Sequence, residues 1–302
     1  MKEKLFSEFE RQTEESWASK IETDLKGKPT DTVLSKTEDG IEIKPNYFEN
    51  SGDSTTIFRE TSNWKIGFEL TKESNTEFLE QLRGGANLAF IHVNDITNLD
   101  DLLKDVMSEI IDLKIIYQGS NLEQLKMNLD SNIQILVDPF QNSQDASEHK
   151  DILIAADIYK NSGATSAQSM AFTASQFTET LTANPDYVAI KVAIGLDYFE
   201  EIASLRGLRA ILGQIKAEFG WEGTFEIFPV PSAYYLSCKE VNNNILRITT
   251  MCMSGILGGA DGFITNSFNM KAEEFGNRIS RNIQLLLQEE SYLNKVCNIF
   301  ED

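Results

Sequence analysis

Residues 255–295 read GILGGADGFITNSFNMKAEEFGNRISRNIQLLLQEESYLNK, and this stretch decides the fold class. Glycines at 255, 258 and 259 precede the apolar pair Phe263 and Ile264, a pattern typical of a tight turn that leads into a buried strand. Apolar residues then follow at helical spacing, at positions 275, 279, 283, 286 and 287. A strand that feeds an amphipathic helix is the repeating unit of an α/β protein, so we expect earlier copies upstream.

Strand and helix patterns do alternate from residue 64 onward. Strands are predicted over 65–70, 88–93, 113–117, 133–138, 152–157, 187–193, 224–229 and 261–265. Helices are predicted between them over 75–82, 99–111, 122–129, 164–181, 198–219 and 239–253. Eight strands are the number that closes a barrel, so we predict a (β/α)8 TIM barrel over residues 64–302. An open, doubly wound parallel sheet is the alternative.

Residues 1–63 differ from the barrel pattern and are predicted to form an N-terminal extended helical arm. A broken helical stripe ends at Gly27 and Pro29, and residues 37–54 are polar and rich in turn formers. The arm carries the aromatic residues Phe6, Phe9, Trp17, Tyr47 and Phe48. Because such a segment cannot build its own core, these side chains need a surface, on this barrel or on another subunit.

The composition argues against several kinds of partner and location. The formal net charge of -20 argues against nucleic acid and anionic membranes as partners, since proteins that bind phosphates concentrate Lys and Arg. The three cysteines have no CxxC spacing, which fits a reducing compartment. No apolar stretch is long enough to span a bilayer, and residues 1–17 lack the apolar core of a signal peptide. We expect a cytoplasmic protein.

In a barrel of this kind, functional side chains gather at the carboxyl ends of the strands. The polar residues expected there are Glu69, His92, Asn94, Asp95, Gln118, Asp138, Asp157, Tyr159, Ser232 and Asn266. Asp138 and Asp157 end neighbouring strands and could form a carboxylate pair for acid–base work or metal binding. Alternatively, Asp138 forms a turn before Pro139 and Asp157 caps a helix. The candidates for a substrate pocket are Gln118, Tyr159, Glu226, Ser232 and Asn266.

Lys191 is the most suggestive single residue. In the strand YVAIKVA, side chains alternate, so Lys191 shares the small-residue face with Ala189 and Ala193 and is expected to point into the barrel. A desolvated lysine loses proton affinity and can act as a Schiff-base nucleophile. A buried ion pair with Glu226, on the next strand, is the alternative without chemistry.

Other catalytic patterns are missing. The two histidines, His92 and His149, are too few for a histidine metal site, so no metal is expected. The sequence contains no GxSxG, no P-loop and no GxGxxG after a strand.

Several stretches, in order along nearly the whole chain, carry a family resemblance. They are 24–28 (DLKGK), 37–48 (TEDGIEIKPNYF), 160–173 (KNSGATSAQSMAFT), 201–212 (EIASLRGLRAIL) and 273–296 (EEFGNRISRNIQLLLQEESYLNKV). The last resembles the helix F-S-x-R-I-A-R-N-T-Q-L-x-L-x-E-E-S of methylmalonyl-CoA mutases, and the others resemble that family's N-terminal entry, Q-E-A-G-A-T and E-I-A-K-L-R-A-A-R segments. This resemblance implies a barrel through whose centre the catalytic subunit threads an acyl-CoA. It also implies adenosylcobalamin chemistry that interconverts methylmalonyl-CoA and succinyl-CoA.

The sequence departs from the catalytic pattern of that family. Residues 226–233 read EIFPVPSA where catalytic subunits carry R-T-H-S-Q-T-S-G, and residues 156–158 read ADI in place of G-Y-H, so the general-acid histidine is missing. The cobalamin motif D-x-H-x-x-G does not occur. These losses resemble those of the small subunit of heterodimeric mutases.

The resemblance therefore implies a non-catalytic chain that pairs with a large catalytic subunit as a heterodimer, with a homodimer as the expectation for the isolated chain. We expect no catalytic residue and no cofactor on this chain, and adenosylcobalamin on the partner. Two alternatives stay open. The first is an independent barrel lyase or aldolase that uses Lys191 with Asp138 or Asp157. The second is a barrel that binds a CoA ester without converting it.

Overall fold

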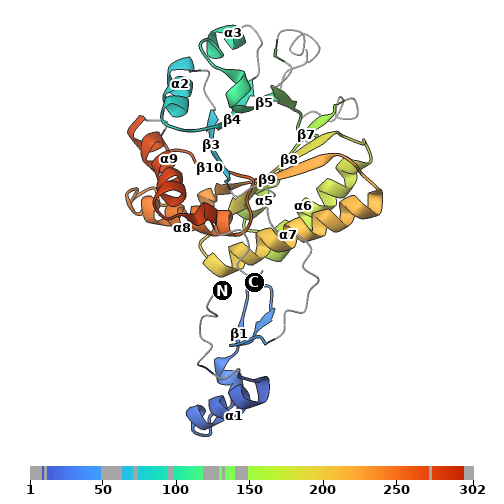
Figure 1. Ribbon diagram of the computed structural model, residues 1–302, viewed down its shortest axis with the longest axis vertical. Coiled ribbons are helices and arrows are strands. Elements are labelled where there is room, and N and C mark those ends of the chain that lie inside the picture. The colour runs from blue at the N-terminus through green and yellow to red at the C-terminus, as the bar shows by residue number, and fades with distance from the viewer. Residues whose placement is uncertain are drawn as a thin grey trace, which may run out of the picture. The chain divides into compact units, whose positions relative to one another are not determined.

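The computed structural model describes residues 9, 12–48, 63–70, 74–93, 98–117, 129–130, 133–139, 149–271 and 274–295. The chain divides into two compact units, Met1–Thr55 and Thr56–Asp302. Figure 1 labels many of the helices and strands of both units. No described helix is both long and apolar enough to cross a membrane.

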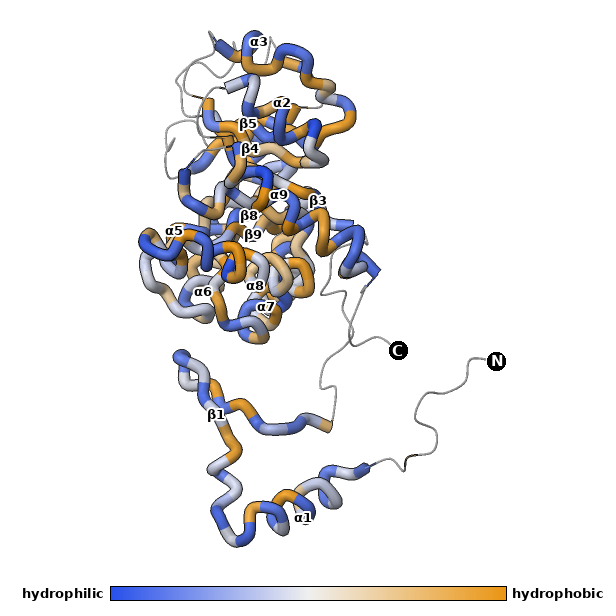
Figure 2. Tube along the Cα trace, turned by 90° about the vertical axis from the view of Figure 1, so that its left-hand side faces the viewer, coloured by the Kyte–Doolittle hydropathy of each residue, from blue (hydrophilic) through white to orange (hydrophobic). Residues whose placement is uncertain are grey.

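The described part of the first unit, residues 9 and 12–48, consists of short elements, and none of its residues is buried. Its helix α1 (Glu14–Leu25) begins at a capping box, in which Thr13 and Ser16 exchange side-chain to backbone hydrogen bonds. A 3-10 turn η1 (Thr30–Val33) leads to the antiparallel pair β1 (Ser35–Lys36) and β2 (Glu42–Ile43). Trp17 meets Phe48 edge-on, with ring centroids 6.0 Å apart. No residue of α1 is buried, although Figure 2 shows hydrophobic positions along the helix.

The second unit contains eight described parallel strands. They are β3 (Lys65–Leu70), β4 (Leu88–Val93), β5 (Asp112–Tyr117), β6 (Gln134–Leu136), β7 (Asp151–Ala155), β8 (Tyr187–Ile194), β9 (Thr224–Pro231) and β10 (Gly262–Ile264). They form a five-stranded sheet in the order β10-β3-β4-β5-β6 and a three-stranded sheet in the order β7-β8-β9.

Backbone hydrogen bonds join the two sheets at both seams. Between β6 and β7, Val137 N donates to Asp151 O at 3.2 Å and Leu153 N donates to Val137 O at 3.0 Å. Between β9 and β10, Asp261 N donates to Ile227 O at 3.1 Å. The eight strands therefore follow one another around a closed ring in chain order, which is the predicted α/β barrel.

The helices of this unit follow the strands. They are α2 (Asn75–Arg83), α3 (Leu99–Leu102), α5 (Asp157–Asn161), α6 (Ser166–Leu181), α7 (Tyr198–Phe219), α8 (Asn243–Leu257) and α9 (Glu274–Glu289), with 3-10 turns η3 (Ser108–Ile110), η5 (Ala233–Tyr235) and η6 (Leu293–Lys295). The predicted helix 99–111 is wrong: it ends after one turn, and Asp105 takes a left-handed φ of 63°. Most of the predicted helix 122–129 lies outside the described residues.

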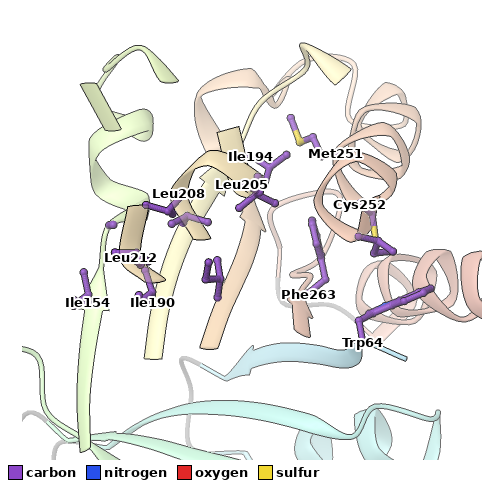
Figure 3. Close-up of a cluster of buried hydrophobic side chains, with 14 of the residues drawn as sticks. Trp64, Ile154, Ile190, Ile194, Leu205, Leu208, Leu212, Met251, Cys252 and Phe263 are labelled. Atoms are coloured by element: carbon purple, nitrogen blue, oxygen red, sulfur yellow. The ribbon is translucent and has the colours of Figure 1, made fainter. Parts of the chain in front are cut away.

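Side chains of β8 alternate between two cores, as the sequence predicts. Val188, Ile190 and Val192 belong to the core between the strands and the helices, where Figure 3 shows Ile190 near Leu208 and Leu212 of α7. Ala189 and Ala193 belong instead to the core enclosed by the strands. Lys191 shares this inward parity, so its position follows from the strand period of two.

Candidate functional site

Four charged or titratable side chains meet at the carboxyl ends of the barrel strands. Lys191 on β8 donates from Nζ to Oε1 of Glu69 on β3 at 2.9 Å, and its Nζ lies 3.5 Å from Oδ2 of Asp157 at the start of α5. His92 on β4 places Nε2 2.7 Å from the same Oε1 of Glu69. These four residues, which we call the carboxyl-end cluster, come from strands β3, β4 and β8 and from the start of α5, just after β7.

The two carboxyl groups of the cluster have pKa values that are shifted in opposite directions. Burial by itself would raise the pKa of Glu69, but the hydrogen bond from His92 and the charge of Lys191 outweigh it and lower that pKa to about 2. For Asp157, burial is the larger effect and raises the pKa above its ordinary value, against the pull of Lys191. Glu69 is therefore ionised at neutral pH.

Lys191 keeps its proton in this setting. Burial would lower its pKa, but the carboxylates of Glu69 and Asp157 raise it above the ordinary lysine value. The loss of proton affinity expected from burial alone is thus not observed. A Schiff-base nucleophile needs the neutral amine, so the cluster resembles an ion-pair network more than an activated lysine.

A cavity of about 790 Å³ lies beside this cluster. Glu69 and Asp157 form part of its wall, with Asn161 from α5 and Asn266 after β10. Its apolar wall comes from the end of β9 and from α8, at Val230, Pro231 and Ile248. The volume is that of a small-molecule site, and the position is the one that barrels use for binding.

The structure brings three of the predicted residues, Glu69, Asp157 and Asn266, to this cavity. Asn266 lines it, and its Oδ1 accepts a hydrogen bond from Glu69 N at 3.4 Å. Asp157 lines it as well and pairs with Lys191. Gln118, Asn94 and Asp95 lie outside the described residues.

Three other candidates have different surroundings. The Tyr159 hydroxyl donates to Oε1 of Gln176 on α6 at 2.8 Å, so this ring faces the helix layer. The Ser232 hydroxyl is fully buried and donates to Oδ1 of Asn161 at 2.8 Å, which orients a cavity residue without reaching the cavity. Asp138 is buried, and its charge, together with burial of the ring, raises the pKa of Tyr159. The proposed pairing of Asp138 with Asp157 stays a prediction.

Glu226 does not pair with Lys191, which corrects the expected ion pair. Its Oε1 accepts from Lys65 Nζ at 2.5 Å, and its Oε2 lies 3.4 Å from Lys114 Nζ. The Tyr187 hydroxyl also donates to Oε2, at 2.5 Å. Because Lys65 and Tyr187 begin their strands, this second cluster closes the amino end of the barrel, and Glu226 is not part of the carboxyl-end pocket.

Lys114 is the most deeply buried member of this amino-end cluster, at 1% exposure. It pairs with Asp112 at 3.0 Å and donates to Oε1 of Gln134 at 2.5 Å. Its Nζ also lies 4.5 Å from the ring centroid of Tyr187. The lysine charge is thus balanced by two carboxylates, since burial of an unpaired ammonium would be strongly unfavourable. For Glu226, burial would raise the pKa, but Lys114 and Lys65 lower it.

Large apolar side chains fill the barrel between the two clusters. Phe90 on β4 and Phe228 on β9 are fully buried and meet edge to face, with ring centroids 5.2 Å apart. Leu88, Ile116, Leu136, Leu153 and Ile264 complete this inner core. The centre of the barrel is therefore occupied by the protein's own side chains.

Sequence reasoning missed the residues that reach the cavity from helices. Asn161 lies at the end of α5, where its Oδ1 also accepts from Ala233 N at 3.0 Å. Asn277 on α9 donates to Oε1 of Glu77 on α2 at 2.7 Å, and both line the cavity. Strand periodicity gives no information about residues on helices. Only the helical repeat of residues 277–282 (NRISRN) could have indicated which face of the helix carries Asn277.

The two histidines of the chain lie in different surroundings. Of the two histidines, His92 is bound to Glu69, and His149 is buried at 7% exposure. Within the described ranges, no three His, Cys, Asp or Glu side chains are grouped as metal ligands.

Comparison with known proteins places these features in a family. The family model described as methylmalonyl-CoA mutase matches residues 111–300. The methylmalonyl-CoA mutase small subunit of Porphyromonas gingivalis is 25% identical over 372 residues, covering 98% of this chain and 60% of that protein. The probable mitochondrial methylmalonyl-CoA mutase of Caenorhabditis elegans is 22% identical over 389 residues, covering 95% of this chain and 52% of that protein.

A shorter match is closer in sequence: the methylmalonyl-CoA mutase of Rhizobium meliloti is 33% identical over 156 residues, covering 46% of this chain and 22% of that protein. Among solved structures, dihydropteroate synthase from Thermus thermophilus aligns with a TM-score of 0.47 at 11% identity, over 77% of this chain and 94% of that chain. The chain spans 60% and 52% of the length of the first two relatives. Since the family model covers more than half of its residues, the chain belongs to the methylmalonyl-CoA mutase family.

Proposed function

We propose that this chain is the small, non-catalytic subunit of a methylmalonyl-CoA mutase-like, adenosylcobalamin-dependent isomerase, and that it supports a large catalytic subunit as its heterodimeric partner. The observation that carries the proposal is the filled barrel centre. A catalytic chain of this family is implied to pass its acyl-CoA through that centre, but here Phe90 and Phe228 meet there. Their rings occupy space that a pantetheine chain would need.

The state of the polar groups supports the same role. Lys191 is paired with Glu69 and Asp157 and keeps its proton, so it offers no neutral amine. The family name of the Porphyromonas gingivalis relative, a small subunit, agrees with a supporting role. We place the cofactor on the large subunit and the complex in the cytoplasm.

The first unit supplies the expected contact surface. Ile41, Ile43 and Tyr47 are exposed in it, although they are large apolar side chains, and α1 buries none of its residues. A unit with so little buried surface gains stability when a partner covers it. We propose that the large subunit covers this surface.

Co-expression with the large mutase subunit from the same source tests the proposal. The two chains should co-purify, and the isolated chain should neither bind cobalamin nor convert methylmalonyl-CoA. The double variant Ile41→Glu and Ile43→Glu should weaken co-purification, whereas Ser19→Glu, which adds a charge at an exposed polar position of α1, should not. Cobalamin-dependent turnover by the isolated chain would overturn the proposal.

The CoA-ester alternative has a direct test as well. Calorimetric titration of the isolated chain with methylmalonyl-CoA and succinyl-CoA should give no saturable heat, because the barrel centre is filled. Saturable binding would show that an acyl-CoA site survives and would remove the main support for a purely structural role.

A further inference from the structure

The cavity of about 790 Å³ beside the carboxyl-end cluster is lined by an asparagine whose amide is held in one orientation. Oδ1 of Asn161 accepts from the Ser232 hydroxyl at 2.8 Å and from Ala233 N at 3.0 Å. Because a backbone N–H can only donate, this contact fixes which end of the amide carries the oxygen. Nδ2 of Asn161 has no acceptor among the described residues, yet the protein does not enclose it. Asn161 therefore brings an oriented, free donor to the cavity wall.

Two further asparagines of the wall have one free amide atom each. Asn266, after β10, is exposed, and its Oδ1 accepts from Glu69 N at 3.4 Å, so its Nδ2 is a second donor without an acceptor in the described part of the chain. Asn277 on α9 has the reverse arrangement, because its Nδ2 donates to Glu77 at 2.7 Å and its Oδ1 has no donor there. The cavity thus offers two free amide donors and one free amide acceptor, from three different elements.

The charges of the wall indicate a neutral ligand. Glu69, Asp157 and Glu77 line the cavity, and Lys271, which is exposed, is the only cation among its described lining residues. Lys191 balances the charge of Glu69 from behind the wall without lining the cavity. An anion would meet an excess of carboxylates, whereas a cation would meet the free amide hydrogens. A neutral molecule that both donates and accepts hydrogen bonds suits both kinds of group.

We propose that this cavity binds a small neutral polyol of about three to six carbon atoms, whose hydroxyl oxygens accept from Asn161 and Asn266 and whose hydroxyl hydrogens bind Oδ1 of Asn277. Each hydroxyl both donates and accepts, so neighbouring hydroxyls satisfy the amides and the carboxylates together. The carbon face of the polyol lies on the apolar wall at Val230 and Ile248. The site is independent of the proposed subunit role, because it requires binding by this chain alone.

Saturation-transfer NMR titration of the whole chain tests this site with glycerol, xylitol and myo-inositol as probes. Malonate and methylammonium serve as the anionic and cationic comparisons at equal ionic strength. The unfolding temperature is not a suitable measure, because polyols also stabilise proteins through exclusion from their surface. At least one polyol should bind saturably and more tightly than either ion. If none of the three polyols saturates, or if an ion binds more tightly than all of them, the inference is overturned.

Variants at the two asparagines outside the buried core separate binding from folding. The double variant Asn266→Ala and Asn277→Ala should fold normally and weaken polyol binding by about tenfold or more, through the loss of two hydrogen bonds between neutral groups. Asn243→Ala, at the exposed first residue of α8 outside the cavity, should leave binding unchanged. Asn161→Ala should weaken binding as well, but it also removes the acceptor of the buried Ser232 hydroxyl. The double variant therefore decides: if it binds as tightly as the native chain, the proposed site is wrong.

Discussion

The ammonium of Lys191 lies 2.9 Å from Oε1 of Glu69, across the carboxyl end of the barrel from β8 to β3. Both side chains are buried, so each charge depends on the other for its stability. Because of this pairing, the pKa of Lys191 lies above the ordinary lysine value, whereas burial alone would lower it.

Lys191 should therefore resist Schiff-base formation. Borohydride reduction in the presence of a small aldehyde or keto acid at neutral pH should leave Lys191 unmodified, while exposed lysines such as Lys239 react at their ordinary slow rate. Peptide mass spectrometry of the reduced protein measures this. Preferential labelling of Lys191 would revive the lyase hypothesis.

Removal of the carboxylate at position 69 should be costly. Glu69→Gln leaves the buried ammonium of Lys191 with Asp157 alone, and we expect a loss of about 3 kcal/mol in the free energy of unfolding at neutral pH. Urea unfolding followed by tryptophan fluorescence measures this loss. Glu240→Gln, at an exposed carboxylate, serves as the control and should change stability by less than about 0.5 kcal/mol.

The carboxyl group of Glu69 also predicts how the free energy of unfolding changes at acidic pH. Its pKa is depressed from 4.5 to about 2 in the folded protein, so its stabilisation is fully present above about pH 4.5 and is lost as the pH falls toward 2. The free energy of unfolding should therefore fall less steeply between these pH values in Glu69→Gln than in the native chain. Equal slopes for the two proteins would show that Glu69 has an ordinary pKa.

The amino-end cluster should show strong coupling between Lys114 and Glu226. Glu226→Gln leaves the ammonium of Lys114 with Asp112 as its remaining carboxylate, and a loss of about 3 kcal/mol is expected. The double variant Lys114→Met and Glu226→Gln should lose less than the sum of the single changes, with a coupling of about 1 to 3 kcal/mol. A double-mutant cycle by urea unfolding measures it, and additive losses would contradict the pairing.

Shortening a side chain of the inner core should destabilise the barrel. Phe228→Ala removes a fully buried ring that meets Phe90, and we expect a loss of about 3 to 5 kcal/mol. Phe199→Ala, at a ring with 79% exposure, is the matched control and should change stability by less than about 0.5 kcal/mol. Denaturant unfolding compares the two. A small effect of Phe228→Ala would indicate that the barrel centre is loosely filled.

Much of the barrel could be predicted from the sequence because its signals are local. The strand period of two places Ala189, Lys191 and Ala193 on one face of β8, and the structure confirms that face as inward. Tyr198–Phe219 was predicted to the residue, since Asp197 caps its start and Gly220 ends it in a left-handed conformation. The 99–111 helix failed because the pattern does not reveal the left-handed turn at Asp105.

The ion-pair partners inside the barrel could not be predicted, because they depend on how far along the barrel axis each charged side chain lies. Glu226 lies beside Ala189 in the register of β8 and β9, whereas Lys191 lies beside Phe228. The two charges are thus one inward layer apart, and each finds a partner on a more distant strand. Inward parity is a property of one strand, but the choice of partner depends on how all eight strands are staggered.

Both ionic clusters use the same strand, with Tyr187 at one end of β8 and Lys191 four residues later. A slip of β8 by one residue would turn both side chains toward the helices and bring Val188 and Ile190 into the barrel. Such a slip would leave Glu226 without its tyrosine and Glu69 without its ammonium at the same time. The polar groups at the two ends therefore act as a check on strand alignment during folding, because a misaligned barrel loses a hydrogen bond at its amino end and an ion pair at its carboxyl end.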